Sequence, residues 1–465
     1  MPRKVFSFIA LAACCLTARA DQIVTPTETA IRLRVQPMAA PQPALRYLLL
    51  PELKQMNPGN PIQGYLRCFA EQQTFFFSKE ACERRAQLED MPLEQLPARE
   101  LLDYGKCALQ QADWAARLDK PDWQFLLKLK TDRGSLLLPD LQQMRTLNFA
   151  LKVRFRAEVA LHRFDDALRT AQTMFAMSRH MAEHPTLIAD LIGIAMARVT
   201  LGPLEEMLEQ PGCPNLYWAL TNLPKPFIPL DRGMQGERLV IPTQLHDLDN
   251  AAPMNADQLK TLIAHIDKLG QLEGKRGSVR AWLDARTKDE MSVSAARRHL
   301  LEPGLPPERR IERIRQLLRF PADQVILLDE MRAYEARRDE IMKLMNLPIW
   351  QRDALVAQLK PEKGELLFGI RVMPVSMVLI AQGRLEQRIA LLRHVEALRL
   401  YAAEHAGQLP EKLSDCPVPL PPDPFTGQAF HYQLEGTTAH LRGTPARGME
   451  KNRDDNPHYE VTIQK

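Results

Sequence analysis

Glycine and cysteine are scarce in this sequence, and its net charge is small. Only 21 of the 465 residues are glycine and 7 are cysteine, and 61 Lys and Arg residues are nearly balanced by 57 Asp and Glu residues. These values exclude a collagen-like chain and a disulfide-dense scaffold. The formal net charge of +4 gives no reason to expect a nucleic-acid partner. A hydrophobic share of 45% excludes a disordered chain and allows a sizeable core.

Motifs that carry well-understood chemistry are also missing. The sequence has no Gly-x-Ser-x-Gly nucleophile elbow, no Gly-x-Gly-x-x-Gly dinucleotide fingerprint and no Cys-x-x-Cys pair. The segment 270–278 has the glycines of a phosphate loop, but Arg276 follows Lys275 where a Ser or Thr would coordinate magnesium. A helix connector with Ser278 as N-cap is the better interpretation of this segment.

The N-terminus has the pattern of a secretory signal peptide. Arg3 and Lys4 form a basic start, residues 5–16 are almost all apolar, and Ala18 and Ala20 carry the small side chains that a signal peptidase recognises. The apolar run is too short to remain as a membrane span, and cleavage is expected after Ala20. We therefore expect an exported protein that resides in the periplasm or at the outer envelope.

A second maturation signal lies inside the same segment. Leu11-Ala12-Ala13-Cys14 resembles a bacterial lipobox, in which the cysteine becomes the lipid-carrying first residue of the mature chain. In the other interpretation, Cys14 is one more apolar residue of the signal core. The mature protein leaves the cytosol in both cases, and a lipid anchor at Cys14 stays open.

Five cysteines follow the signal segment. Cys68, Cys82 and Cys107 lie close enough in sequence for one pair among them to form a disulfide in an oxidising compartment. The odd total leaves at least one thiol unpaired or intermolecular. Burial of each cysteine as a small apolar residue is an equally good interpretation, so the connectivity stays open.

Apolar residues recur at helical spacing through most of the chain. In the clearest case Leu147, Leu151 and Phe155 lie on one helix face. Residues 157–175 resemble the helix–turn–helix of a tetratricopeptide repeat, but no period of about 34 residues recurs, so we expect a single αα-hairpin. The apolar stretch from Leu187 to Leu208 contains charged residues and is expected to be a buried helix, with no transmembrane span in the mature chain.

Proline-rich segments divide the chain, and its C-terminal part differs from the rest. A long amphipathic helix closes near Gly407, and the strand-like runs 429–434 and 438–442 flank a Glu435-Gly436 turn signal. We predict a mostly α protein of packed helical hairpins with a small C-terminal unit of one helix plus a β-hairpin. The predicted units are a signal peptide at 1–20, a Pro-rich extended lead-in at 21–61, an α-helical body at 62–384, the C-terminal unit at 385–443 and a polar, mobile tail at 444–465.

Two resemblances extend this interpretation. The phrases EALRLYAAEHAGQLPEKL and DPFTGQAFHY, within residues 396–432, resemble the C-terminal part of the major pseudopilins of type II secretion. Most of the chain, including QPGCPNLYWAL at 210–220, is also similar to secreted bacterial helical proteins that carry no known activity. The first resemblance implies an accessory role in a secretion or pilus-like system. The second implies the architecture alone.

His180-Met181-Ala182-Glu183-His184 matches the His-x-x-Glu-His pattern of inverted zincins. At a spacing of four residues His180 and His184 lie on one helix face, where they can hold zinc while Glu183 acts as a base on metal-bound water. Pro185 follows directly, so the motif is also typical of a polar helix end with a histidine near the negative pole of the helix dipole. A zinc-dependent hydrolase is therefore the alternative to a protein without a cofactor.

Seven arginines gather between residues 297 and 319, and Arg309, Arg310 and Arg313 belong to this cluster. In one interpretation they bind an anionic partner, such as a lipid headgroup or an acidic protein face. In the other they are only solvated, because the opposite side of the same helix is apolar and packs inward. That apolar side comprises Ile311, Ile314, Leu317 and Leu318.

The missing catalytic constellation and the helical hairpins together favour a binding function. We predict an exported, non-enzymatic protein whose helical surface binds another macromolecule, most simply a protein of the cell envelope. A metal-dependent hydrolase and an accessory component of a secretion system are the two alternatives.

Overall fold

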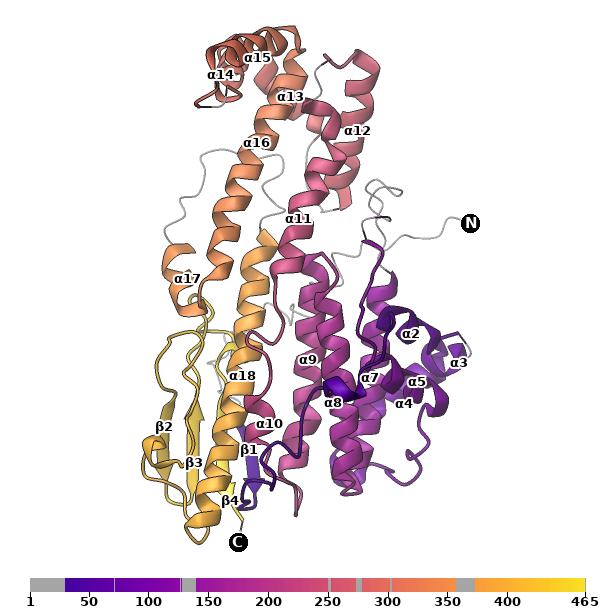
Figure 1. Ribbon diagram of the computed structural model, residues 1–465, viewed down its shortest axis with the longest axis vertical. Helices are drawn as coiled ribbons and strands as arrows, with labels where there is room; N and C mark the ends of the chain where they lie inside the picture. Colours follow the sequence, from indigo (N-terminus) through magenta and orange to yellow (C-terminus); the bar gives the residue numbers. More distant parts are fainter. Residues whose placement is uncertain are drawn as a thin grey trace.

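The computed structural model describes residues 30–70, 72–125, 127, 139–249, 252–272, 278–301, 303–356 and 373–464. The predicted signal peptide and Cys14 lie outside these residues. Helices make up most of the described chain, and four strands form one small sheet (Figure 1). The predicted mostly α fold with a small C-terminal β unit is confirmed.

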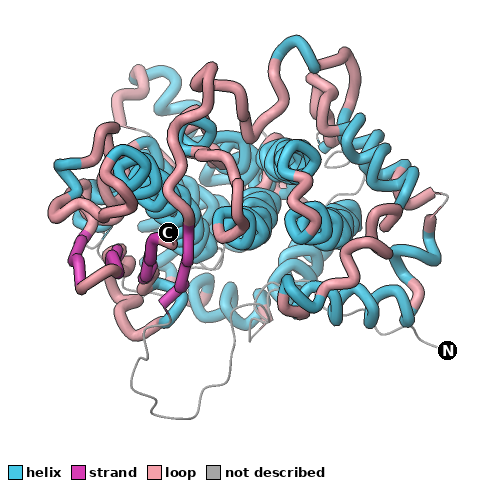
Figure 2. The backbone as a smooth tube through the Cα atoms, turned by 90° about the horizontal axis from the view of Figure 1, so that it is seen from below, coloured by secondary structure: helices cyan, strands magenta, loops and turns pink. Residues whose placement is uncertain are grey.

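Four long helices lie side by side in the lower part of the molecule, and Figure 2 views them end-on. The helical spacing of apolar residues places them on one face of each helix, and this face packs inward. Leu147, Leu151 and Phe155, for example, are all fully buried. The predicted αα-hairpin is formed by the first two of these helices, joined by a short turn at His162. The four helices are α7 (Pro139–Ala160), α8 (Phe164–Ala182), α9 (Leu187–Leu208) and α18 (Met373–Glu404).

Helix α9 is the most apolar of these four helices. Its start is capped by Thr186, whose side chain accepts a hydrogen bond from the Ala189 amide. Among the described helices it alone is long and apolar enough to cross a membrane, and 61% of its most apolar window is buried inside the protein. Its buried side packs on α7, α8 and α18, as expected for a core helix.

Shorter helices cover the remaining sides of this bundle. The N-terminal group packs on α7 and α8, and Figure 1 shows it at the right. It consists of α2 (Pro61–Arg67), α3 (Gln73–Phe77), α4 (Lys79–Asp90) and α5 (Lys106–Ala115). Two further short helices, α10 (Tyr217–Thr221) and α17 (Ile349–Val356), lie in the connections on either side of the upper helices.

The upper part of Figure 1 is a separate stack of helices that projects from the bundle. We call the described residues of 231–342 the arm, and the rest of the described chain the body. The arm has its own hydrophobic cluster, in which Leu283, Val325 and Leu327 are fully buried. Its helices are α11 (Asp231–Gln244), α12 (Ala256–Leu272), α13 (Val279–Thr287), α14 (Glu290–His299), α15 (Pro307–Arg319) and α16 (Ala322–Met342).

The sheet lies beside α18 and contains more strands than expected. Strands β2 (His431–Glu435) and β3 (Thr438–Arg442) form the predicted hairpin. Two further strands, β1 (Ala30–Val35) and β4 (His458–Ile463), complete the order β1-β4-β3-β2.

The predicted mobility of the tail is therefore wrong where β4 forms, and the extended lead-in contributes a paired strand, β1. Strand β4 alternates buried Tyr459 and Val461 with polar residues, which is the period of a half-buried strand. Strand β1 pairs with β4 in parallel and buries Leu33 and Val35. The two ends of the described chain thus hold each other in one sheet.

Candidate functional site

Helices α14 and α15 form the end of the arm (Figure 1). Helix α14 is capped by Asp289, whose side chain accepts a hydrogen bond from the Met291 amide, and α15 begins with Pro307 at its first position. Leu317 and Phe320 anchor α15, because both side chains are buried in the hydrophobic cluster of the arm.

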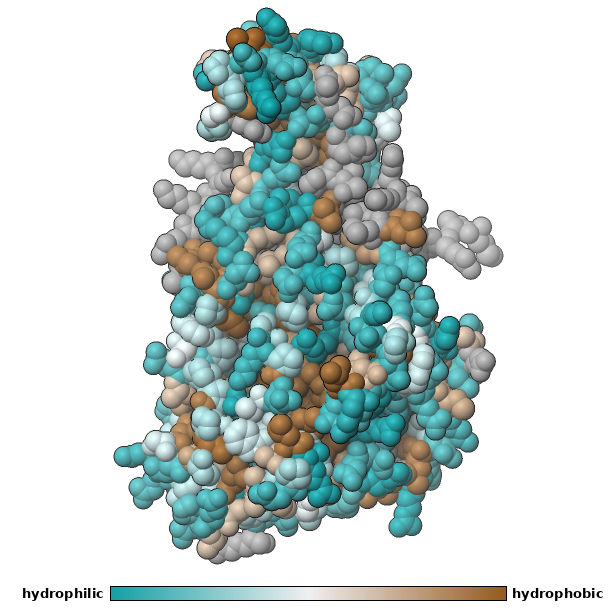
Figure 3. All heavy atoms as spheres, in the orientation of Figure 1, coloured by the Kyte–Doolittle hydropathy of each residue, from teal (hydrophilic) through white to brown (hydrophobic). Residues whose placement is uncertain are grey.

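The rest of the apolar side of α15 is exposed. Ile311 is 50% exposed and Leu318 is 63% exposed, and Met291 on the adjoining α14 is 78% exposed. The expectation that Ile311, Ile314, Leu317 and Leu318 all pack inward is therefore wrong, and only Leu317 is buried. These side chains are exposed because α15 lies at the end of the arm. Figure 3 shows apolar residues among hydrophilic ones at the top of the molecule.

The predicted arginine candidates separate into two kinds. Arg313 has a structural role, because it donates to Asp249 and to Gln316, both at 2.8 Å. Arg309 and Arg310 are exposed on the first turns of α15. The end of the arm therefore presents aliphatic side chains next to guanidinium groups that face solvent. We call Met291, Arg309, Arg310, Ile311, Ile314 and Leu318 the arm-tip surface.

A charged groove lies on the body, between α5, α7 and α8, with a volume of about 710 Å³. Arg154 holds Asp113 through two hydrogen bonds of 2.7 and 3.0 Å and lies 3.7 Å from Glu158. Burial raises the pKa of Glu158 to about 7, although Arg154 and the Thr170 hydroxyl both favour its ionised form. These charges are paired with one another, so they position the helices.

A smaller pocket of about 400 Å³ adjoins this groove and shares two of its arginines. Arg46, Arg117 and Arg169 line it together with a single carboxylate, Asp165. Arg117 is held by the Gln172 side chain at 3.1 Å. This pocket is not visible in the sequence, because its arginines come from three separate segments.

The predicted zinc candidates occupy a helix end. Helix α8 ends at Ala182, so His180 and His184 do not share one helix face as expected. His180 Nδ1 lies 2.9 Å from the Tyr65 hydroxyl, and burial lowers the pKa of His180 to about 4. The candidate base Glu183 caps the helix end.

The environment of His184 is apolar. Its ring lies edge-on to the rings of Trp123 and Phe125, and its Nδ1 is 2.9 Å from the Thr186 hydroxyl. Glu183 pairs with Arg232 at 3.2 Å. Each predicted metal residue therefore has a partner of its own, and zinc binding at this motif stays a prediction.

The cysteines are free thiols in the described chain. Cys68 is buried and donates to the Gly64 carbonyl oxygen, while Cys82 and Cys107 are exposed. Burial raises the pKa of the Cys68 thiol to about 12, which makes it unreactive. A disulfide among these three cysteines stays a prediction.

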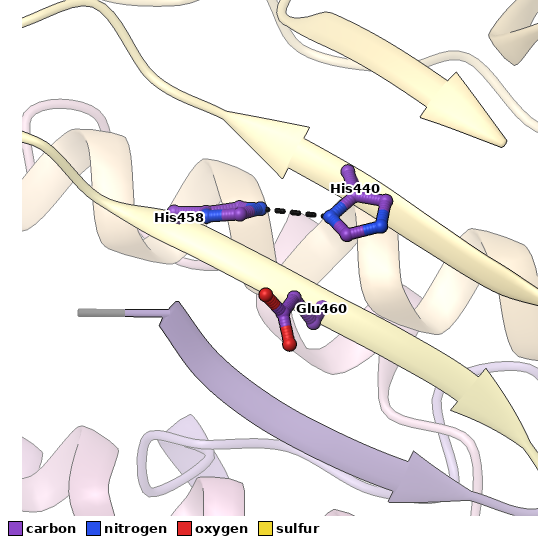
Figure 4. A group of neighbouring side chains, drawn as sticks. All are labelled: His440, His458 and Glu460. Atoms are coloured by element: carbon purple, nitrogen blue, oxygen red, sulfur yellow. Dashed lines mark hydrogen bonds between the residues drawn. The ribbon is translucent and has the colours of Figure 1, made fainter. Parts of the chain in front are cut away.

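Two further features of the structure were not expected from the sequence. His440, His458 and Glu460 meet on the sheet (Figure 4), and their spacing was not informative because β4 was not expected. Asp190 on α9 is fully buried, and both its carboxylate oxygens lack a hydrogen-bond partner among the described residues. The only sequence signal for this feature was that Asp190 is a charged residue within an apolar stretch.

No protein-family model, curated protein or solved structure matches this chain.

Proposed function

We propose that the protein is an exported binding module, and that its arm-tip surface docks against an acidic, partly apolar face of a protein in the cell envelope. The observation that carries the proposal is the exposure of Ile311 and Leu318 beside Arg309 and Arg310. Exposed apolar patches rimmed by polar residues mark interaction sites, and arginine and methionine are enriched in protein interfaces.

The shape of the molecule supports this proposal. The arm projects from the body, so its end can reach a partner while the body stays clear of it (Figure 1). Leu317 and Phe320 hold α15 in place, so its exposed side is ordered before a partner arrives. A pre-ordered surface loses less conformational entropy on binding.

Cross-linking in intact cells tests the proposal. A photo-reactive benzoylphenylalanine replaces Leu318 in one variant and Leu53, which is 90% exposed on the body, in a control variant. We expect a discrete protein adduct from position 318 and none of the same mass from position 53. Equal adducts from both positions, or adducts with lipid alone at 318, would contradict the proposal.

Charge reversal sharpens the same experiment. Arg309→Glu together with Arg310→Glu should abolish the adduct at Leu318 if the partner face is acidic. A control pair, Arg84→Glu and Arg99→Glu, makes the same change of charge at exposed positions of the body and should leave the adduct intact. An adduct that survives the first pair shows that the partner is not acidic.

The smaller body pocket supports a second candidate function, the binding of a small anion. Its three arginines outnumber its one carboxylate, and arginine recognises carboxylate and phosphate through paired hydrogen bonds. Titration with citrate in a calorimeter tests this candidate. Arg169→Ala should abolish the heat of binding, whereas Arg32→Ala on the distant sheet should not.

The two other functions predicted from sequence remain open. A hydrolase centred on His180, Glu183 and His184 gains little support from the geometry. His180 contacts Tyr65, Glu183 pairs with Arg232, and His184 lies past the end of α8. A secretion-system role rests on the resemblance of residues 396–432. A variant that lacks residues 386–443 tests this role. If that variant kept its localisation and its partner, the secretion-system role would be rejected.

A further inference from the structure

Two histidines and one glutamate converge on one face of the sheet (Figure 4). His440 lies directly opposite Glu460 in the pairing of β3 with β4. His458 precedes Glu460 by two residues on β4, so both side chains leave the same face of the strand. The three residues therefore meet because of strand register, and they lie far from the arm-tip surface.

The distances fit a single metal ion. His440 Nδ1 and His458 Nε2 are 3.1 Å apart, and one ligand atom from each of the three residues lies within 4.8 Å of the others. Two nitrogens bound to the same tetrahedral zinc ion lie about 3.3–3.4 Å apart, for zinc–nitrogen bonds of about 2.0–2.1 Å. The histidine pair needs to separate by only a few tenths of an ångström to hold the ion.

The surroundings prepare these groups for a cation. Glu435 lies 3.6 Å from the far nitrogen of His440, which leaves Nδ1 turned toward His458. A carboxylate hydrogen-bonded behind a ligating histidine commonly fixes the orientation of the ring, and Glu435 needs to approach by about 0.5 Å to do so. Arg32 donates to one oxygen of Glu460 at 2.8 Å and lowers the pKa of Glu460, so Arg32 competes with an ion for this ionised carboxylate but leaves its other oxygen able to face the ion.

The strands themselves hold the site rigidly. Strand β4 is hydrogen-bonded on both sides, to β1 and to β3. His458 is nearly fully buried, while His440 and Glu460 are partly exposed, so an ion can enter from solvent on one side. Sites built on such regular elements keep their geometry better than sites on loops.

We propose that His440, His458 and Glu460 bind one zinc ion, with His440 using Nδ1, His458 using Nε2 and Glu460 using one carboxylate oxygen. Two nitrogen ligands and one oxygen ligand suit zinc, and the fourth position takes water or a donor from another molecule. The ion ties β3 to β4 and so strengthens the sheet that joins the two ends of the described chain. This site is independent of the proposed docking function.

Calorimetry with zinc chloride on the purified, chelator-treated full chain tests the proposal. We expect one zinc ion per chain and a higher Tm with zinc than without it. His440→Ala and Glu460→Gln should each weaken zinc binding by at least about tenfold. His431→Ala, on exposed strand β2, is the matched control and should bind zinc like the unaltered chain.

Two further measurements keep the test decisive. Because His458 is buried, His458→Ala can unfold β4, so circular dichroism must show native helix and sheet content before its affinity is compared. Arg32→Ala removes a cation that competes for Glu460 and should tighten zinc binding several-fold. Zinc binding that is unchanged in folded His440→Ala, or that disappears in His180→Ala instead, would overturn the proposal.

Discussion

The body and the arm place their charged residues in opposite ways. In the body, Arg399 and Glu396 of α18 form an ion pair of 3.0 Å in which both side chains are completely buried. In the arm, Arg280 and Asp323 form a pair of 2.5 Å whose side chains remain 42% and 21% exposed. A buried pair must be fully hydrogen-bonded to be tolerated, whereas an exposed pair contributes little. Buried charges such as this pair thus specify how the body packs, whereas the pair between Arg280 and Asp323 in the arm stays partly exposed to solvent.

Apolar residues show the same contrast. The body has one large hydrophobic cluster that runs from the helices into the sheet. The arm has a smaller cluster, and α15 leaves three of its aliphatic side chains outside it. The difference indicates that most of the apolar burial that stabilises the fold lies in the body, whereas the arm leaves part of its apolar surface exposed to solvent.

The largest expected effect comes from breaking the buried pair of the body. Glu396→Ala leaves the Arg399 guanidinium buried without a counter-charge and removes the acceptor of the Leu216 amide. We expect a loss of about 3–5 kcal/mol in the free energy of unfolding, measured by urea denaturation. Arg280→Ala in the arm should cost less than about 1 kcal/mol. Equal losses in the two variants would remove the contrast between the two regions.

Asp190 departs from this pattern in the body, because both oxygens of its buried carboxylate lack a hydrogen-bond partner among the described residues. Burial, together with the nearby charges of Asp231, Glu237 and Glu183, raises the pKa of its carboxyl from 3.8 to about 9. The folded chain therefore retains a proton that the unfolded chain releases, so stability falls as the pH rises from about 4 toward 9.

Asp190→Asn keeps the shape of the protonated acid and removes this titration. We expect a gain of about 3 kcal/mol in the free energy of unfolding at pH 8 and almost none at pH 4. Denaturant unfolding at the two pH values measures the difference. An equal change at both values would show that Asp190 is ionised in the folded protein.

The junction between body and arm depends on a glycine. A Cβ atom at Gly236 of α11 would lie 1.7 Å from the Pro185 carbonyl oxygen, so glycine permits this close approach. Gly236→Ala should destabilise the protein by about 2 kcal/mol through forced displacement of α11. Gln235→Ala on the exposed side of the same helix should be nearly neutral. Thermal unfolding compares the two, and a neutral Gly236→Ala would show that the arm is not held at this contact.

Local patterns predicted much of the fold. The helical period identified α7 and α8, and alternation around Glu435-Gly436 identified the hairpin of β2 and β3. Strand β1 was missed because its partner β4 lies at the other end of the chain, whereas β4 also pairs with the nearby β3 and its alternation of apolar and polar residues was overlooked. Their pairing joins Ala30 to His458, and no short-range signal encodes such a contact.

The candidate sites also differ in whether a local sequence pattern reveals them. The arginines of α15 were visible in the sequence, because charge clusters are local. The exposure of Leu318 was not, because periodicity defines an apolar face without showing whether another layer covers it. The cluster of His440, His458 and Glu460 depends on strand register, and the pocket around Arg46, Arg117 and Arg169 depends on helix packing; neither is a local property.

The smallest expected effect separates two neighbouring leucines of α15. Leu318→Gln should change the free energy of unfolding by less than about 0.5 kcal/mol, because the side chain is 63% exposed and the two residues have similar helix propensity. Leu317→Gln, one residue earlier, places an amide in the buried cluster and should melt several degrees lower. Thermal unfolding of both variants is the measurement. If Leu318→Gln were as harmful as Leu317→Gln, then α15 would pack on both sides and could not serve as a free docking surface.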